Sequence, residues 1–123
     1  MKRYLMMTCT FWGLFAGCGG GSAFQSVERE AFAAKLSEEG VQLVDVRTPE
    51  EFKEGHIPGA VNIDVNGADF EEKICTLNPE KPLLLYCRSG RRSKLAAQKA
   101  SKQGFQVTEL EGGILSWPGP LEQ

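Results

Sequence analysis

The sequence lacks an apolar segment long enough to span a membrane. Its apolar stretch near the amino terminus, Tyr4–Ala16, has 13 residues, whereas a transmembrane helix needs about 20. Lys2 and Arg3 precede the stretch and small residues follow it. A basic start, a short apolar segment and small residues are typical of a secretory signal peptide. The alternative is a buried core helix, but the polar residues within the stretch give a poor amphipathic pattern, so we interpret residues 1–17 as a signal peptide.

The end of this segment predicts a lipid anchor. Residues 15–18 (FAGC) resemble a bacterial lipobox, in which a Cys is lipidated and becomes the new amino terminus. The glycine-rich residues that complete the range 18–23 are typical of a flexible tether, and several acyl chains anchor a protein stably. We therefore expect a lipoprotein of the bacterial cell envelope, membrane-anchored through Cys18, with its domain outside the cytoplasm. The alternative is a soluble secreted protein in which Cys18 carries no lipid.

The chain is also poor in cysteine and histidine, with four Cys and one His. Cys9 lies in the predicted signal and Cys18 at the predicted anchor, which leaves Cys75 and Cys87. A disulfide framework or a zinc site needs more partners than these. We expect neither, and no cofactor.

Positive charge is not in excess. Two of the 14 basic residues and none of the 16 acidic ones lie in residues 1–17, so the mature chain would have 12 basic and 16 acidic residues, a net charge of −4. This balance argues against a nucleic-acid binder. Four of those basic residues nevertheless fall between Arg88 and Lys94, and this local concentration requires an explanation.

Apolar periodicity and turn residues predict strands that alternate with helices. Apolar and β-branched runs predict strands at 42–46, 60–63, 83–86 and 106–110. A first helix is expected from the capping residue Ser26 to Gly40. A second is expected to begin after Thr48, with Pro49 and Glu51 in its first turn. Further helices are expected over 69–77 and 93–103, with a helical turn at 114–117. The alternation predicts one α/β domain at 24–119 with a tail at 120–123. Its sheet is expected to be mostly parallel, with helices on both faces.

One segment combines a nucleophile with positive charge. Cys87–Arg92 lies between a predicted buried strand and a predicted helix. Ligands bind at the carboxyl ends of parallel strands, and a helix amino terminus offers unpaired N–H groups. Gly90 allows successive amides to face one centre. Lowering the pKa of Cys87 by about two units, worth roughly 2.7 kcal/mol, would make it mostly thiolate at neutral pH without an adjacent base.

The same segments resemble the signatures of single-domain rhodaneses. Residues 86–93 (YCRSGRRS) are similar to the active-site loop of that family. Residues 45–47, 51–52, 55–60 and 62–63 resemble two further signatures of the family, and residues 110–117 resemble its C-terminal signature. The resemblance implies a five-stranded rhodanese fold and a sulfurtransferase of the thiosulfate sulfurtransferase type. In that reaction a small anionic donor such as thiosulfate leaves a persulfide on Cys87, and cyanide or a thiol removes the sulfur.

The resemblance also implies the roles of the loop residues. Cys87 is the expected catalytic nucleophile, and Arg92 occupies the loop-closing position of the family. Substrate and persulfide binding is assigned to Arg88, Ser89, Gly90, Arg91 and Arg92, with Ser89 and Gly90 acting through their backbone amides.

Three polar residues outside the loop are expected to be structural. Asp45, at the end of a buried strand, is predicted to brace loops, and Arg47 to pair with Glu51. His56 is the single histidine and lies in a Gly/Pro turn. The family does not use this position as a base, so we expect His56 to support the turn.

Other functions remain as alternatives. Dual-specificity phosphatases have one more residue between Cys and Arg than the segment Cys87–Arg92, so the shorter loop favours sulfur over phosphate or arsenate chemistry. A module that presents a persulfide without turnover is a second hypothesis, although the intact Cys87 favours an enzyme. Cys75 has two possible roles: a small buried hydrophobic residue, or a thiol that resolves the persulfide as a disulfide.

Overall fold

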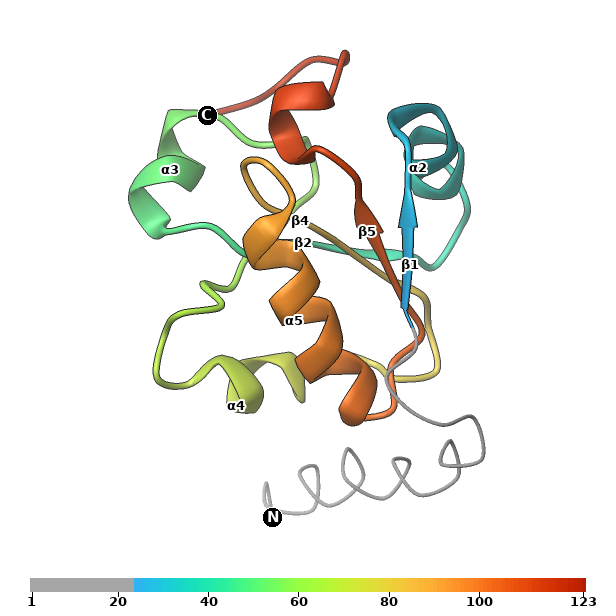
Figure 1. The fold of residues 1–123 in the computed structure, drawn as a ribbon, viewed down its shortest axis with the longest axis vertical. Coiled ribbons are helices and arrows are strands. Elements are labelled where there is room, and N and C mark those ends of the chain that lie inside the picture. Colours follow the sequence, from blue (N-terminus) through green and yellow to red (C-terminus); the bar gives the residue numbers. More distant parts are fainter. Residues whose placement is uncertain (1–23) are drawn as a thin grey trace.

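The structure is a computed structural model that describes residues 24–123. The predicted signal peptide and Cys18 lie outside these residues. Strands and helices alternate along the described chain (Figure 1) in the order β1 (Phe24–Val27), α2 (Arg29–Leu36), β2 (Gln42–Asp45), α3 (Pro49–Glu54), β3 (Val61–Asn62), α4 (Phe70–Ile74), β4 (Leu83–Tyr86), α5 (Arg91–Lys102), β5 (Val107–Leu110) and the 3-10 helix η2 (Gly113–Ser116).

The five strands form one sheet in the order β1-β5-β4-β2-β3, and every pair is parallel. β4 is central and consists of Leu83, Leu84, Leu85 and Tyr86, all of them buried. A continuously apolar strand is typical of a sheet covered on both faces. The predicted α/β fold with a five-stranded parallel sheet is therefore confirmed.

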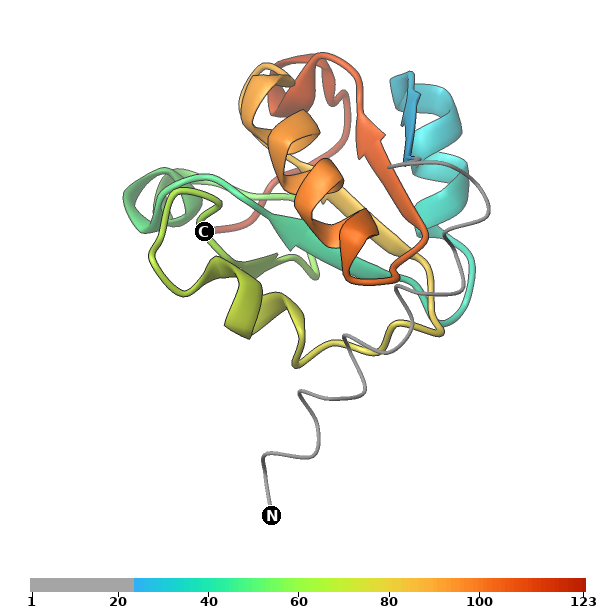
Figure 2. The same cartoon turned by 60° about the horizontal axis from the view of Figure 1, so that its bottom comes forward.

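Helices cover both faces of the sheet and create two apolar layers (Figures 1 and 2). On one face α4 and α5 pack on alternate strand residues, with Phe70, Ile74 and Ala97 among the buried side chains. On the other face Phe32 of α2 packs with Leu84 and Leu110. The ring of Phe32 also meets Trp117 edge-to-face, with centroids 6.3 Å apart.

Two sequence predictions about the helices are wrong. Ser26 does not cap a helix but lies in β1, where it is in register with Glu109 of β5. The helical pattern of residues 93–103 also predicts Leu95 on the inner face together with Ala96 and Ala100, but Leu95 is 43% exposed. The buried face of α5 runs through Ser93, Ala96, Ala97 and Ala100, a spacing of three and four residues that leaves Leu95 off the inward face.

The start of α3 follows the predicted pattern. Thr48 Oγ1 accepts the Glu51 N–H, and the Glu51 carboxylate accepts the Thr48 N–H, so the capping box is complete. The tail also contacts this region, because His56 and Glu122 exchange two backbone hydrogen bonds of 2.9 and 2.8 Å. Glu122, which lies after the predicted domain boundary at residue 119, therefore forms a β-bridge with the domain.

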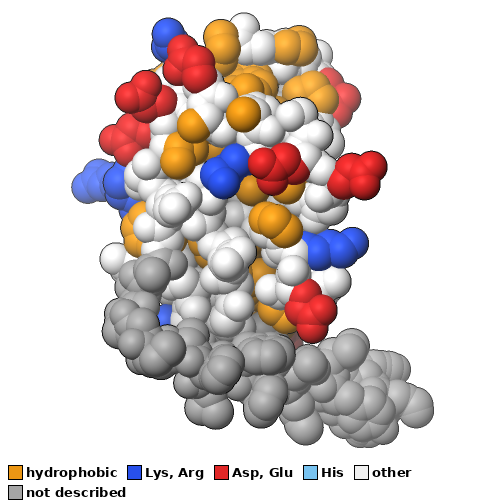
Figure 3. Space-filling model, turned by 90° about the vertical axis from the view of Figure 1, so that its right-hand side faces the viewer, with side chains coloured by type: hydrophobic (Ala, Val, Ile, Leu, Met, Phe, Trp, Pro, Cys, Tyr) orange, Lys and Arg blue, Asp and Glu red, His pale blue; other side chains and the backbone are white. Residues whose placement is uncertain are grey.

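The described surface carries charges of both signs. On the face that includes α2, acidic and basic side chains alternate with apolar ones (Figure 3). No helix within residues 24–123 has the length and apolar character needed to cross a bilayer.

Candidate active site

Cys87 follows the last residue of β4, at the end of the sheet where α3, η2 and the start of α5 gather (Figure 1). Its side chain is 1% exposed. The Gly90 N–H donates to Cys87 Sγ at 3.0 Å. Gly90 has φ +109°, a conformation that L side chains rarely adopt, and it precedes the first residue of α5. The loop therefore directs an amide and the positive end of a helix dipole at the sulfur.

η2 holds the outer side of this loop. The Ile114 N–H donates to the Cys87 carbonyl at 2.8 Å, and the Leu115 N–H donates to the Arg88 carbonyl at 3.2 Å. A Cβ on Gly113 would lie 2.3 Å from the Arg88 carbonyl oxygen. Gly113 is therefore required, because the backbone at the start of η2 is in contact with the backbone of Cys87 and Arg88.

The three loop arginines have different environments. Arg88 and Arg91 are exposed, and their guanidinium groups make no ion pair or hydrogen bond with residues 24–123. They border a hollow of about 540 Å³ whose lining is Arg88, Ser89, Arg91, Arg92 and Leu95. Arg92 instead donates to both carboxylate oxygens of Glu51, at 2.8 and 3.1 Å. Two unpaired cations thus face solvent beside the cysteine, and the third is paired.

The pairing of Arg92 corrects the prediction for Arg47. Arg47 does not bind Glu51; it donates to both carboxylate oxygens of Asp45 and to the Gly55 carbonyl. Asp45 and Arg47 are both buried, and Asp45 also accepts the Arg47 N–H at 2.9 Å. Burial lowers the pKa of Arg47, but the hydrogen bond and charge of Asp45 raise it more. This pair ties the end of β2 to the end of α3.

His56 and Cys75 do not contact Cys87 in the part of the chain that the structure describes. The His56 ring stacks on Phe52 with centroids 3.7 Å apart, and its Nδ1 lies 2.9 Å from the Phe52 carbonyl oxygen. Cys75 follows α4 and is partly buried against the core, with Sγ 3.7 Å from Gln103 Oε1. The resolving role of Cys75 stays a prediction.

A family model of the rhodanese-like domain matches residues 28–119, most of the chain. The chain belongs to the rhodanese family.

Several named relatives share this domain. The chain is 41% identical over 83 residues to the putative sulfurtransferase YtwF of Bacillus subtilis, covering 68% of this chain and 79% of the relative. It is 40% identical over 96 residues to thiosulfate sulfurtransferase GlpE of Pseudomonas aeruginosa, covering 76% and 84%. The putative sulfur carrier protein YrkF of B. subtilis is 37% identical over 103 residues, which cover 82% of this chain and 55% of YrkF. This chain thus spans about half the length of YrkF.

Solved structures agree with the fold. A rhodanese-related protein from Thermoplasma volcanium superposes with a TM-score of 0.71 at 27% identity, covering 80% of this chain and 98% of that one. A rhodanese-like domain protein from Staphylococcus aureus gives 0.71 at 29% identity, covering 80% and 97%. Each match covers four fifths of this chain.

One part of this rhodanese site was not found from the sequence. Glu109 lies in β5, is fully buried, and accepts hydrogen bonds from Ser26 and Ser93, both at 2.5 Å, and from Lys94 at 2.9 Å. Burial lowers the pKa of Lys94, but the hydrogen bond and charge of Glu109 raise it more. The available signal was a Glu within a predicted strand, because acidic residues are depleted in strands.

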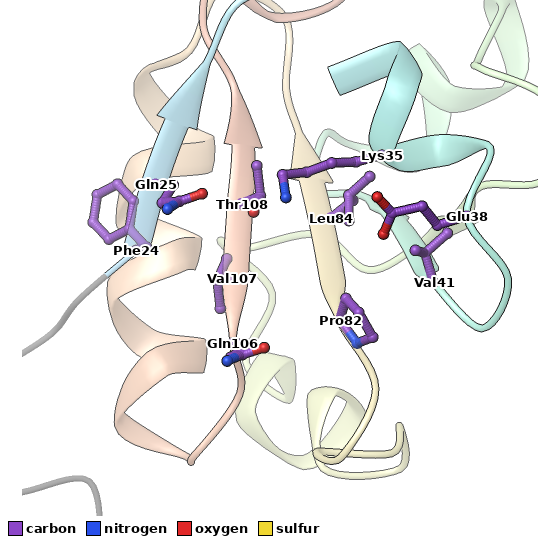
Figure 4. Close-up of a pocket in the computed structure, with 10 residues that line it drawn as sticks. All are labelled: Phe24, Gln25, Lys35, Glu38, Val41, Pro82, Leu84, Gln106, Val107 and Thr108. Atoms are coloured by element: carbon purple, nitrogen blue, oxygen red, sulfur yellow. The ribbon is translucent and has the colours of Figure 1, made fainter. Parts of the chain in front are cut away.

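A second cavity lies at the opposite end of the sheet. It has a volume of about 550 Å³ between α2 and the first residues of β1, β4 and β5, with Lys35 and Glu38 on its rim (Figure 4). None of its lining residues belongs to the Cys87 loop. Residues 24–123 also contain no cluster of side chains suited to a metal ion.

Proposed function

We propose that this chain is a sulfurtransferase that moves sulfane sulfur from a small anionic donor such as thiosulfate to cyanide or a thiol. Its relatives support sulfurtransferase activity in general, because YtwF and GlpE carry that name. The observation that carries the proposal is the hydrogen bond from the Gly90 N–H to Cys87 Sγ at the start of α5. A thiolate accepts such a bond more strongly than a thiol, so this contact favours the nucleophilic form.

The first half-reaction would load the cysteine. The Cys87 thiolate attacks the outer sulfur of thiosulfate, a new S–S bond forms, and the S–S bond of the donor breaks. The electron pair of that bond leaves with sulfite. Arg88 and Arg91, exposed and unpaired, would bind the donor oxyanion, because charge-assisted hydrogen bonds from guanidinium groups are strong.

The second half-reaction would unload it. An acceptor such as cyanide attacks the outer sulfur of the persulfide, and the electron pair returns to Cys87 Sγ. Backbone amides at the loop and the amino terminus of α5 would stabilise negative charge on either sulfur species. The same amides would therefore serve both half-reactions.

Thiocyanate formation from thiosulfate and cyanide tests the proposal, with the full chain and a Cys87→Ser variant. We expect turnover by the wild type, none by the variant, and a mass increase of one sulfur atom on the Cys87 peptide after thiosulfate alone. A wild type without turnover, yet with a reduced and alkylatable Cys87, would contradict the enzyme proposal and favour a persulfide-presenting module. Equal turnover by both proteins would exclude Cys87 as the sulfur carrier.

We also propose that lipid on Cys18 anchors the protein in a bacterial cell envelope. Support comes from the sequence at residues 1–18 alone, because these residues lie outside the described structure. The test is fractionation of cells that express the wild type or Cys18→Ser. We expect the wild type with membranes and the variant in the soluble fraction, whereas a variant retained on membranes would contradict lipid anchoring.

A further inference from the structure

Three buried side chains form a hydrogen-bonded series that starts at the nucleophile. Cys87 is 1% exposed, and Ser93 and Glu109 are fully buried. Cys87 Sγ lies 3.5 Å from Ser93 Oγ, and Ser93 Oγ lies 2.5 Å from Glu109 Oε1. The thiol of a reduced Cys87 therefore has a hydroxyl as its side-chain partner, and that hydroxyl has a carboxylate behind it.

The direction of these hydrogen bonds follows from counting protons. A serine hydroxyl has one proton, and an ionised carboxylate can only accept. Ser93 therefore donates to Glu109, at a distance typical of a charge-assisted O–H···O⁻ bond. The Gly90 carbonyl, at 3.3 Å from Ser93 Oγ, is a more distant acceptor. Ser93 then presents a lone pair to Cys87, so the thiol S–H donates to Ser93.

This arrangement conflicts with a thiolate unless a proton moves. With Glu109 ionised, a Cys87 thiolate would place two anions inside the protein with one hydroxyl between them. Like charges at close range in a buried site disfavour the doubly ionised state. A proton transferred along the series removes the conflict, because the site keeps a single negative charge.

We propose that Cys87 and Glu109 share one proton through the Ser93 hydroxyl, so that Glu109 holds the proton whenever Cys87 is a thiolate or carries a persulfide. The S–H bond of Cys87 breaks as its proton binds Ser93 Oγ, while the former Ser93 proton binds Glu109 Oε1. Both hydrogen bonds reverse: neutral Glu109 donates to Ser93, and Ser93 donates to the sulfur anion. No proton enters or leaves the buried site in this step.

The return step belongs to the acceptor half-reaction, so in turnover the inference rests on the proposed function. When the outer sulfur leaves with the acceptor, the electron pair stays on Cys87 Sγ. The proton on Glu109 then returns through Ser93 and restores the thiol. Glu109 acts through Ser93 and is a positioning residue, whereas Ser93 touches the reacting sulfur.

Charged and polar groups on α5, β1 and the residues after β5 surround the Cys87–Ser93–Glu109 series. Lys94 of α5 bonds Glu109 and is also 3.6 Å from Glu111, which follows β5. β1 contributes the Ser26 hydroxyl to Glu109. Arg92 of α5 interacts electrostatically with Cys87, but its guanidinium is paired with Glu51 of α3. Lys94 thus offsets the single negative charge that the shared-proton state retains.

The pH dependence of Cys87 alkylation tests the inference without any sulfur donor. We would treat the full chain with iodoacetamide and follow the Cys87 peptide by mass spectrometry, which separates it from the other cysteines. A pair that shares one proton keeps a constant thiolate fraction between its two apparent pKa values, where the singly protonated form dominates. The wild-type alkylation rate should therefore level off over this acidic range. The rate of Glu109→Gln, which cannot take the proton, should continue to fall about tenfold per pH unit across the same range.

Two further variants separate the shared proton from a structural effect. Ser93→Ala removes the connecting hydroxyl and should also lose the low-pH plateau. Ser26→Ala removes a hydrogen bond of equal length to Glu109 but does not contact Cys87, so it should keep the plateau. Thermal unfolding of each variant checks that the fold persists.

The outcomes point in different directions. A carboxylate that acts on Cys87 only as a nearby negative charge would leave the plateau intact in Ser93→Ala, and this result would overturn the inference. A plateau in all four proteins, or in none, would overturn it as well. Because alkylation requires no sulfur transfer, failure of the thiocyanate assay with an intact plateau would refute the proposed function alone.

Discussion

The guanidinium of Arg92 faces the carboxylate of Glu51 through two hydrogen bonds, 2.8 and 3.1 Å long. This pair joins the start of α5 to the first turn of α3, and Thr48 bonds the same carboxylate. The arginine at the loop-closing position therefore holds the loop against α3. Arg88 and Arg91 leave their guanidinium groups in solvent, so the proposed binding of the donor anion is assigned to these two residues.

The Arg92–Glu51 pair should make stability depend on pH in the acid range. The hydrogen bond from Arg92 lowers the pKa of Glu51 from its ordinary 4.5 to about 2. A carboxyl group with a lowered pKa stabilises the fold above its unfolded pKa and loses that effect as pH falls toward the folded value. Glu51→Gln should lower the free energy of unfolding at pH 7 by about 1 kcal/mol, since the pair is partly exposed. Its stability should then decline less than that of the wild type between pH 5 and pH 2.

Urea unfolding across this pH range measures the effect. Glu39→Gln is the matched control, because Glu39 is exposed after α2, and its curve should run parallel to that of the wild type. A Glu51→Gln curve with the same acid slope as the control would show that the pair contributes nothing.

Removing Arg88 or Arg91 should weaken donor binding more than it slows the chemical step. Each Ala variant should raise the KM for thiosulfate several-fold and change kcat less, and the effect should shrink at high salt because exposed charges are screened. Steady-state kinetics at two ionic strengths provide the measurement. Lys102→Ala, at the far end of α5, removes an equal charge and should leave KM unaltered. If it raised KM as much, the effect would be one of net charge.

Gly113→Ala should destabilise the protein strongly. The new Cβ would lie 2.3 Å from the Arg88 carbonyl oxygen and 2.7 Å from that of Cys87, and Gly113 has φ +66°. Gly59 has φ +90° but nothing within 4 Å of a Cβ, so Gly59→Ala measures the conformational cost alone, about 1 kcal/mol. We expect Gly113→Ala to cost at least about 2 kcal/mol more, as overpacking of a rigid contact does. Equal losses in denaturant unfolding would mean that the loop and η2 separate easily.

Asp45→Ala should be among the most damaging single substitutions. It would leave Arg47, which is 6% exposed, without its carboxylate, and breaking a buried ion pair costs about 3–5 kcal/mol. Glu80→Ala, in an exposed loop, should change stability by less than about 0.5 kcal/mol. Thermal and urea unfolding of both variants would measure the loss in free energy of unfolding. A loss for Asp45→Ala no larger than that for Glu80→Ala would contradict the prediction.

Local patterns predicted most of the fold. The apolar run at Leu83–Tyr86 marks the central strand, since a strand buried on both faces has no polar alternation. Thr48 and Glu51 mark the start of α3, because a capping box is complete within four residues. Cys87 and Gly90 meet at the end of β4 for the same reason: their contact spans three residues.

The contacts that the sequence did not predict are long-range. Ser26 bonds Glu109 across 83 residues, and Arg92 bonds Glu51 across 41. A local pattern favoured Ser26 as a helix cap, but strand pairing with β5 gave its hydroxyl a buried carboxylate. Arg47 pairs with Asp45, only two residues away, because the carboxylate of Glu51 is bound by Arg92 from α5. Three-dimensional pairing decided each of these partners.

The parallel register gives the domain two distinct ends. Phe24 pairs with Val107, and Val107 pairs with Leu83 at the start of β4. Cys87 comes four residues later along that strand direction, a rise of about 13 Å. The chain therefore enters the domain at one pole and presents its sulfur at the other. Any tether on the amino-terminal side of Phe24 attaches at the pole opposite Cys87, so a surface bound there would leave the Cys87 pole open to the proposed donors and acceptors.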